Sequence, residues 1–177
     1  TCTTSGALSP PSVASARAAG KTDMTREELL ETARGLPPFP AEAAREYRRE
    51  RETLVAEVNK RLSQRPDLER LVGVGNIAMM RDNHGNHARF VESLLDSYNP
   101  EVLVETVLWV FRAYRAHGFR LAYWPAQLNA WAEVLRARLS PESFAAIDPL
   151  YQWFIVHVPT FVALTDSSVA VGSTVEE

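Results

Sequence analysis

Hydrophobic side chains recur every three or four residues along most of the chain, which is the spacing of one face of an α-helix. In residues 41–64, for example, Tyr47, Leu54 and Val58 form an apolar stripe beside a charged and solvated face. The one weak apolar–polar alternation, near the C-terminus, has no second segment with which a strand could pair. The pattern therefore predicts an all-α fold of about six to seven helices.

Capping residues, glycines and prolines indicate where these helices begin and end. Thr25 stands three residues before Glu28, which is the capping-box arrangement at a helix N-terminus. Gly118 is expected to end the apolar helix over residues 101–117 in the left-handed conformation, with His117 capping its C-terminus. Pro159 should bend the last helix, because proline cannot donate the helical hydrogen bond.

The two ends of the chain lack this periodic pattern. Residues 1–23 are rich in Ser, Ala, Pro and Thr and hold too few large apolar side chains for a packed element or a signal segment. We therefore predict a disordered N-terminal tail over residues 1–23, a single helical domain over 24–165 and a C-terminal tail over 166–177. A chain of 177 residues is long enough for one domain with a real core.

The stretch MMRDNHGNHARF, residues 79–90, looks like a polar loop but continues a helical apolar face. Positions 77, 80, 84, 87, 91, 94 and 98 repeat at helical spacing and place His84 and His87 one turn apart on that face. We therefore predict an unbroken helix that directs both imidazoles toward a cavity. The alternative is a turn at the DNHG motif with both rings in water, since Gly85 within a helix costs about 1 kcal/mol relative to alanine.

Composition and charge exclude several classes of function. Hydrophobic residues make up 46% and charged residues 23% of the chain, and its net charge is −3 without a basic segment, so we expect no nucleic-acid partner. No stretch reaches the roughly 18 apolar residues of a membrane span. Cys2 is the only cysteine, which excludes an intramolecular disulfide and a thiolate zinc site. With no export signal recognised, we expect a cytoplasmic protein.

The residues that could carry chemistry do not form a catalytic pattern. No serine stands in a nucleophile elbow, and no glutamate precedes a histidine by three residues as in di-iron bundles. His84-x-x-His87 could present two imidazoles to a metal, but we predict no metal site. A binding pocket without catalysis is the preferred interpretation, and we expect a protein that is not an enzyme.

The segment YRAHGFRLAYWP, residues 114–125, resembles the corner in bacterial globins that follows the haem-ligating helix. There a ligating histidine lies four residues before a glycine, an apolar residue and an arginine follow the glycine, and an aromatic–proline pair opens the next helix. The matching residues here are Gly118, Phe119, Arg120, Trp124 and Pro125. At the ligand position, however, this chain has Tyr114, which makes it more similar to globin-like sensory and regulatory modules that have lost haem.

The resemblance implies a globin-like domain that binds a small apolar or amphipathic ligand, or a regulatory protein, and signals its presence. The residues that we expect to line the cavity are Met80, His84, His87, Phe111, Tyr114 and His157. The first alternative is a haem protein for gas or redox sensing, ligated by Tyr114 or His117 on one side and His84 or His87 on the other. The second is an assembly subunit that forms a homodimer through an exposed Trp124/Trp131 helix face.

Overall fold

The computed structural model describes residues 24–166, and every regular element in this range is an α-helix. There are eight helices: α1 (Arg26–Arg34), α2 (Ala41–Ser63), α3 (Leu68–Val72), α4 (Ile77–Asp96), α5 (Pro100–Ala116), α6 (Tyr123–Arg138), α7 (Pro141–Val156) and α8 (Val158–Asp166). The all-α prediction is confirmed. Two helices were not predicted separately: the short α3, where a turn was expected, and α8 at the C-terminal end. The predicted N-terminal tail and residues 167–177 lie outside the described residues, while Asp166 still belongs to α8.

The predicted helix boundaries hold where a side chain caps the helix. Thr25 and Glu28 form both hydrogen bonds of the capping box at the start of α1. Asn99 and Ser140 cap α5 and α7, each followed by a proline at a position where the missing N–H costs nothing. His117 is the C-cap residue of α5, and Gly118 follows it with a φ of 94°, as expected for a left-handed stop.

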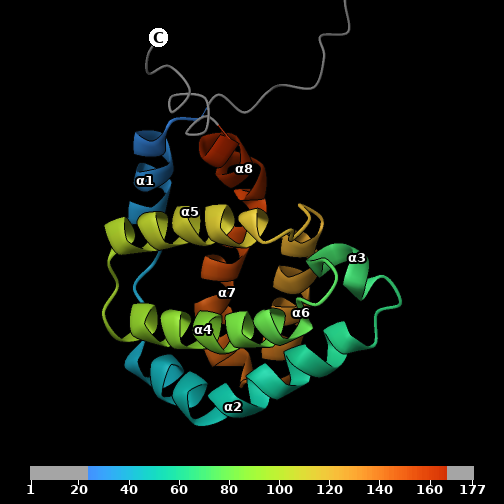
Figure 1. Cartoon of the computed structure of the whole chain (residues 1–177). Helices are drawn as coiled ribbons and strands as arrows, with labels where there is room; N and C mark the ends of the chain where they lie inside the picture. Colours follow the sequence, from blue (N-terminus) through green and yellow to red (C-terminus); the bar gives the residue numbers. More distant parts are fainter. Residues whose placement is uncertain (1–23, 167–177) are drawn as a thin grey trace, which may run out of the picture.

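The last predicted helix is divided rather than bent. α7 ends at Val156, His157 is its C-cap residue, and α8 begins at Val158. Pro159 cannot donate a hydrogen bond to the carbonyl of Ile155, so the helical ladder is interrupted at this point. The division changes the direction of the chain and lets α8 pack against α5 (Figure 1).

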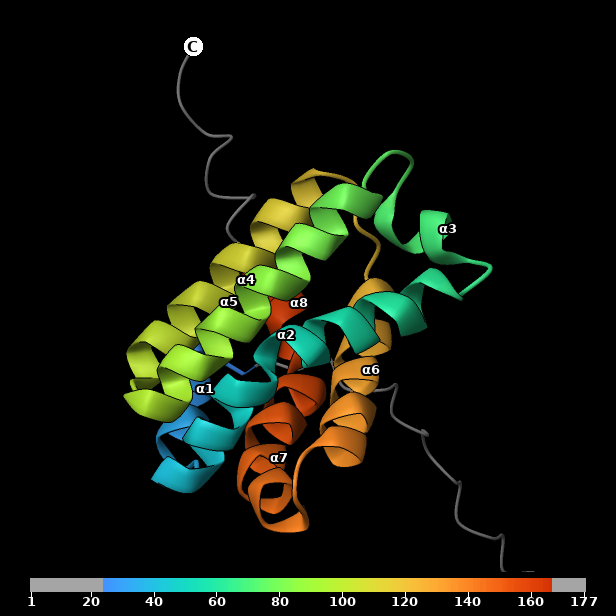
Figure 2. The same ribbon diagram turned by 90° about the horizontal axis from the view of Figure 1, so that it is seen from below.

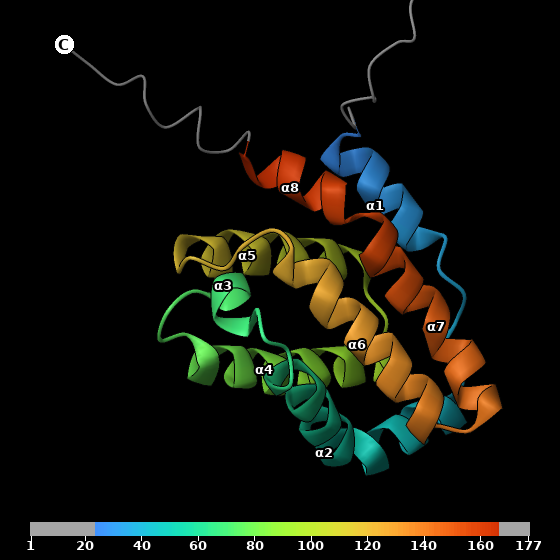
Figure 3. The ribbon, with the colours of Figure 1, turned by 90° about the vertical axis from the view of Figure 1, so that its right-hand side faces the viewer.

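The helices form two layers joined by a pair of connecting helices. α2 packs against α4, α6 and α7, and Figure 2 shows it crossing them on one side of the domain. α5 packs against α1 and α8 on the other side, and α6 and α7 run between the two layers (Figures 1 and 3). α4 and α5 follow one another in the chain, yet they are not among the closely packed helix pairs.

The core lies mainly around α6, and this corrects one prediction about the surface. Trp124 and Trp131 are 2% and 0% exposed, because α6 packs between α2 and α7. The exposed Trp124/Trp131 face on which the assembly-subunit alternative was based is therefore absent. Among residues 24–166, no helix has the length and apolar character required to cross a membrane.

Candidate functional site

The stretch with the two histidines is helical throughout. α4 runs without interruption from Ile77 to Asp96, so the interpretation of DNHG as a turn is wrong. Gly85 adopts no special conformation, and a Cβ at this position would meet only the guanidinium of Arg89 at 3.7 Å. Helix propensity is overridden here by the packing of the apolar face of α4 against α2.

His84 is fully buried and both of its ring nitrogens are used inside the protein. Nδ1 lies 2.6 Å from Oδ1 of Asn59 on α2, and Nε2 lies 3.1 Å from the hydroxyl of Tyr123 on α6. Burial lowers the pKa of His84 to about 4, so the ring is neutral near pH 7. His84 therefore joins three helices and has no nitrogen left for a ligand.

His87, one turn further along α4, occupies an aromatic environment. Its Nε2 lies 3.0 Å from the hydroxyl of Tyr151, and its ring centroid lies 4.9 Å from that of Trp131 and 5.8 Å from that of Phe154. Burial, and secondarily the neighbouring His84, lower the pKa of His87 to about 3. Nδ1 has no hydrogen-bond partner among residues 24–166, and the side chain is only partly buried because one side borders a cavity.

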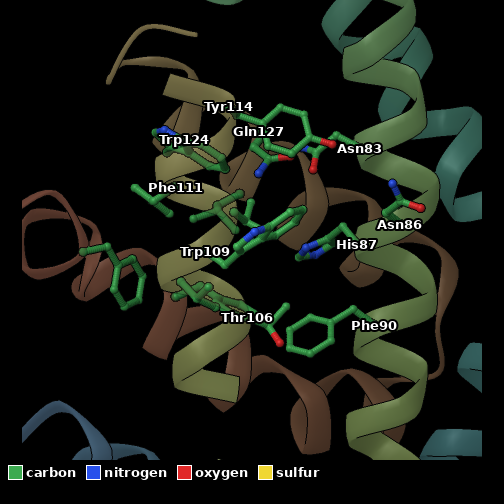
Figure 4. Close-up of a pocket in the computed structure, with 15 residues that line it drawn as sticks. Asn83, Asn86, His87, Phe90, Thr106, Trp109, Phe111, Tyr114, Trp124 and Gln127 are labelled. Atoms are coloured by element: carbon green, nitrogen blue, oxygen red, sulfur yellow. The ribbon is translucent and has the colours of Figure 1, made fainter. Parts of the chain in front are cut away.

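A cavity of about 200 Å³ separates α4 from α5. Figure 4 shows polar side chains of Asn83, Gln127 and Tyr114 toward one end, His87 and Trp109 near the middle, and Phe90 and Thr106 toward the other end. α6, α7 and α8 close the remaining side. The full lining consists of Asn83, Asn86, His87, Phe90, Thr106, Val107, Trp109, Val110, Phe111, Tyr114, Trp124, Gln127, Leu128, Phe154 and Phe161.

Half of the six predicted ligand-binding residues line this cavity. His87, Phe111 and Tyr114 are among its walls, whereas Met80, His84 and His157 are not. Met80 and His84 are fully buried on the part of α4 that faces the helix packing. His157 follows α7, where its Nδ1 lies 2.8 Å from the carbonyl oxygen of Trp153. The prediction that both histidines of α4 face the cavity is therefore correct for His87 and wrong for His84.

The sequence interpretation missed the amide side chains of the cavity. Asn83 is 4% and Gln127 3% exposed, and Asn86 lies at the rim. Asn83, Asn86, His87 and Phe90 follow the i, i+3, i+4, i+7 spacing of one helix face, so extending that face from His87 would have found the α4 members. No comparable pattern marks Gln127, because its neighbours along α6 are core residues.

The donor set does not fit a haem. His84 has both nitrogens occupied, and His117 is exposed at the end of α5 and does not line the cavity. The cavity volume lies below the roughly 300–1,000 Å³ of pockets for drug-sized ligands, which are smaller than a porphyrin. No arginine or lysine of residues 24–166 lines the cavity to pair with propionates. Within the same range, no three His, Cys, Asp or Glu side chains are grouped as metal ligands.

Comparisons with known proteins identify no relative: the chain matches no family model, no curated protein and no solved structure. The residues and geometry described above are therefore the basis of the functional proposal.

Proposed function

We propose that this chain is a non-enzymatic ligand-binding domain of a sensory or regulatory kind, which holds a small, neutral, partly apolar molecule between α4 and α5. The observation that carries the proposal is a cavity with aromatic walls into which two buried amide side chains, Asn83 and Gln127, are directed. Apolar enclosure with a few convergent polar groups is the usual composition of a small-molecule site.

The state of the histidines supports binding rather than catalysis. A general base is most effective when its pKa lies near the working pH, whereas the pKa values of His84 and His87 are lowered to about 4 and 3. The Tyr114 hydroxyl, which borders the cavity, has its pKa raised by burial and so remains protonated. These groups serve as hydrogen-bonding partners in a neutral wall.

The position of α5 supports a regulatory role. Arg34 pairs with Glu101 and Arg115 with Asp166, each at 2.6 Å, so α5 is joined to α1 and α8. The ion pairs of α4, including Arg51 with Glu92 at 2.6 Å, are instead made with α2. A ligand in the cavity would contact both layers at once, and binding energy that differs between two positions of α5 would shift the population between them.

A globin-like identity remains part of this proposal. The cavity lies between the helix with the two histidines and the helix that ends at the globin-like corner, which is where the resemblance would place a bound group. Tyr114, at the ligand position of that resemblance, does line the cavity. The haem alternative has less support because of the donor set and the volume, and addition of hemin without a resulting Soret band would eliminate it.

The proposal is tested by ligand-observed NMR with naphthalene, a neutral bicyclic probe, together with native mass spectrometry of protein purified from its own host. Val107→Phe would fill the cavity from α5 and should abolish naphthalene binding. The matched control is Val102→Phe, on the same helix but 48% exposed and outside the lining. Binding that Val107→Phe leaves unchanged would refute the proposal, as would an unmodified protein that neither retains a ligand from its host nor binds an added probe.

A further inference from the structure

One hydroxyl group organises the polar end of the cavity. The oxygen of Tyr123 lies 3.2 Å from Nδ2 of Asn83, 3.3 Å from Oε1 of Gln127 and 3.1 Å from Nε2 of His84. Tyr123 itself is fully buried and does not line the cavity. It therefore acts on a ligand only through the side chains that it holds.

These contacts decide which atom each amide turns toward the cavity. Asn83 donates its N–H to Tyr123, so its carbonyl oxygen Oδ1 is left over, and Gln127 accepts from Tyr123, so its Nε2 is left over. Neither atom has another partner among residues 24–166, and neither is sealed from the cavity. Both residues are more than nine-tenths buried. A buried amide atom without a partner is costly, which makes this pair a built acceptor–donor edge.

The proton order that produces this edge involves His84. Tyr123 carries a single hydroxyl proton, and Gln127 receives it only if His84 donates Nε2–H to Tyr123 rather than accepting from it. Nδ1 of a neutral His84 is then an acceptor, so this proton order requires the Asn59 amide to be turned from the orientation described above, with Nδ2 in place of Oδ1 at 2.6 Å from Nδ1. His84 is thus a positioning residue for the edge, which gives the buried network a reason to lie directly behind the cavity.

We propose that the ligand of the cavity is a neutral, planar lactam, a ring in which an N–H and a C=O are adjacent. The ligand N–H donates to Oδ1 of Asn83, and the ligand C=O accepts from Nε2 of Gln127. Its apolar remainder lies among aromatic walls that include Phe111, Phe90 and Phe154. Carboxylates, phosphates and amines are rejected, because no charged side chain of the described residues lines the cavity to replace their hydration.

This inference rests on the proposed function, and three related probes separate the two. Carbostyril is a neutral bicyclic lactam, N-methylcarbostyril lacks only its N–H, and naphthalene has the same two-ring outline without polar atoms. By calorimetric titration of the full chain, carbostyril should bind at least about tenfold more tightly than either analogue, since each loses a hydrogen bond that leaves buried amide atoms unpaired.

Substitutions test whether Asn83 and Gln127 form the acceptor–donor edge. Asn83→Leu should bring the affinity for carbostyril down to that for N-methylcarbostyril while naphthalene binding persists. The matched control is Asn129→Leu, an exposed residue of α6 outside the lining, which should retain the discrimination. Gln127→Leu should weaken binding of both lactams but not of naphthalene. Circular dichroism checks whether each variant is folded. If Asn83→Leu does not fold, the relative affinities of the three probes for the unmodified chain still test the lactam inference.

Each outcome has a definite consequence. Equal affinity for the three probes would overturn the lactam inference and leave the proposed apolar ligand site intact. Equal affinity for the two lactams would likewise overturn the lactam inference, because the site would then not recognise the ligand N–H. Failure of every probe to bind would overturn both the lactam inference and the proposed function.

Discussion

His84 and His87 lie one turn apart on α4, yet they belong to two different regions of the molecule. His84 lies in the packed region between α2, α4 and α6, where both of its nitrogens have partners. His87 lies at the boundary with the cavity between α4 and α5, where one nitrogen has a partner and the other has none within the described part of the chain. Within a single helical turn, the polar groups on one face can thus all have partners in the protein while a group on the other face is left without one.

The difference shows how stability and binding are divided between the two faces of α4. In the packed region, both nitrogens of His84 are satisfied by residues of the protein itself and are not available to a ligand, although the Tyr47 hydroxyl and the Trp131 indole N–H are buried there without a partner among residues 24–166. In the cavity region, the atoms of Asn83 and Gln127 that Tyr123 leaves free keep a binding capacity at a cost in stability. Three pairs of variants and one pH series test this division, from the largest expected effect to the smallest.

The largest effect should come from the tryptophans of the two regions. Trp131→Ala removes a fully buried indole from the packed region and should lower the free energy of unfolding by about 3–5 kcal/mol. Trp109 lines the cavity mouth but is 62% exposed, so Trp109→Ala should cost less than about 0.5 kcal/mol. Urea denaturation followed by circular dichroism measures both. Similar losses for the two variants would show that α6 is not the centre of the core.

The next effect concerns pH. Because the pKa values of His84 and His87 are lowered on folding to about 4 and 3, the unfolded chain binds more protons below its own value near 6.5. Stability is therefore fully present above that value and should fall by roughly 1.5–2 kcal/mol per histidine between pH 7 and pH 5. Urea denaturation over this range measures it.

The control for the pH prediction is the double variant His84→Leu/His87→Leu, in which most of this dependence should disappear. The carboxyl groups with lowered pKa, such as Glu46 and Glu92, lose their stabilising contribution only at lower pH. A pH dependence that is the same in the double variant would mean that these histidines are not buried neutral groups.

A smaller effect should distinguish the histidines individually. His84→Leu removes the partner of Asn59 and one of the three contacts of the buried Tyr123 hydroxyl, and should cost about 2–3 kcal/mol. His87→Leu removes one hydrogen bond, and the Tyr151 hydroxyl that loses it is fully buried, so a smaller cost of about 1–2 kcal/mol is expected. Thermal and urea unfolding at neutral pH compare the two. If His87→Leu lowered the free energy of unfolding more than His84→Leu, the assignment of His84 to the packed face and His87 to the cavity face would be wrong.

The smallest effect is a gain in stability. Gly85→Ala should stabilise the domain by about 0.5–1 kcal/mol, since α4 is regular at this position and the new methyl group meets only the flexible Arg89 side chain. Gly73→Ala is the control that should destabilise, because Gly73 has a φ of 88° and its Cβ would lie 3.0 Å from Nδ2 of Asn76. Destabilisation by Gly85→Ala would indicate that α4 is strained or interrupted at that residue.

Local patterns were sufficient to predict most of the helices. Apolar spacing, the Thr25 capping box and the Asn99–Pro100 and Ser140–Pro141 starts depend on interactions within one or two turns, so they can be read along the chain. The continuity of α4 through Gly85 was predicted in the same way. The separation of α7 and α8 was not, because the direction taken after Pro159 depends on the packing of α8 against α5.

In the candidate site too, some features followed from the local sequence and others only from the tertiary packing. Sequence alone determined that His84 and His87 share an apolar helix face, because that follows from a rise and rotation common to all α-helices. Only the tertiary structure decided that His84 meets Asn59 and Tyr123 whereas His87 borders a cavity, and that Trp124 and Trp131 are buried. A turn of helix places a side chain on a face, but what it meets there is supplied by residues far away in the chain, whose approach depends on the packing of the whole domain.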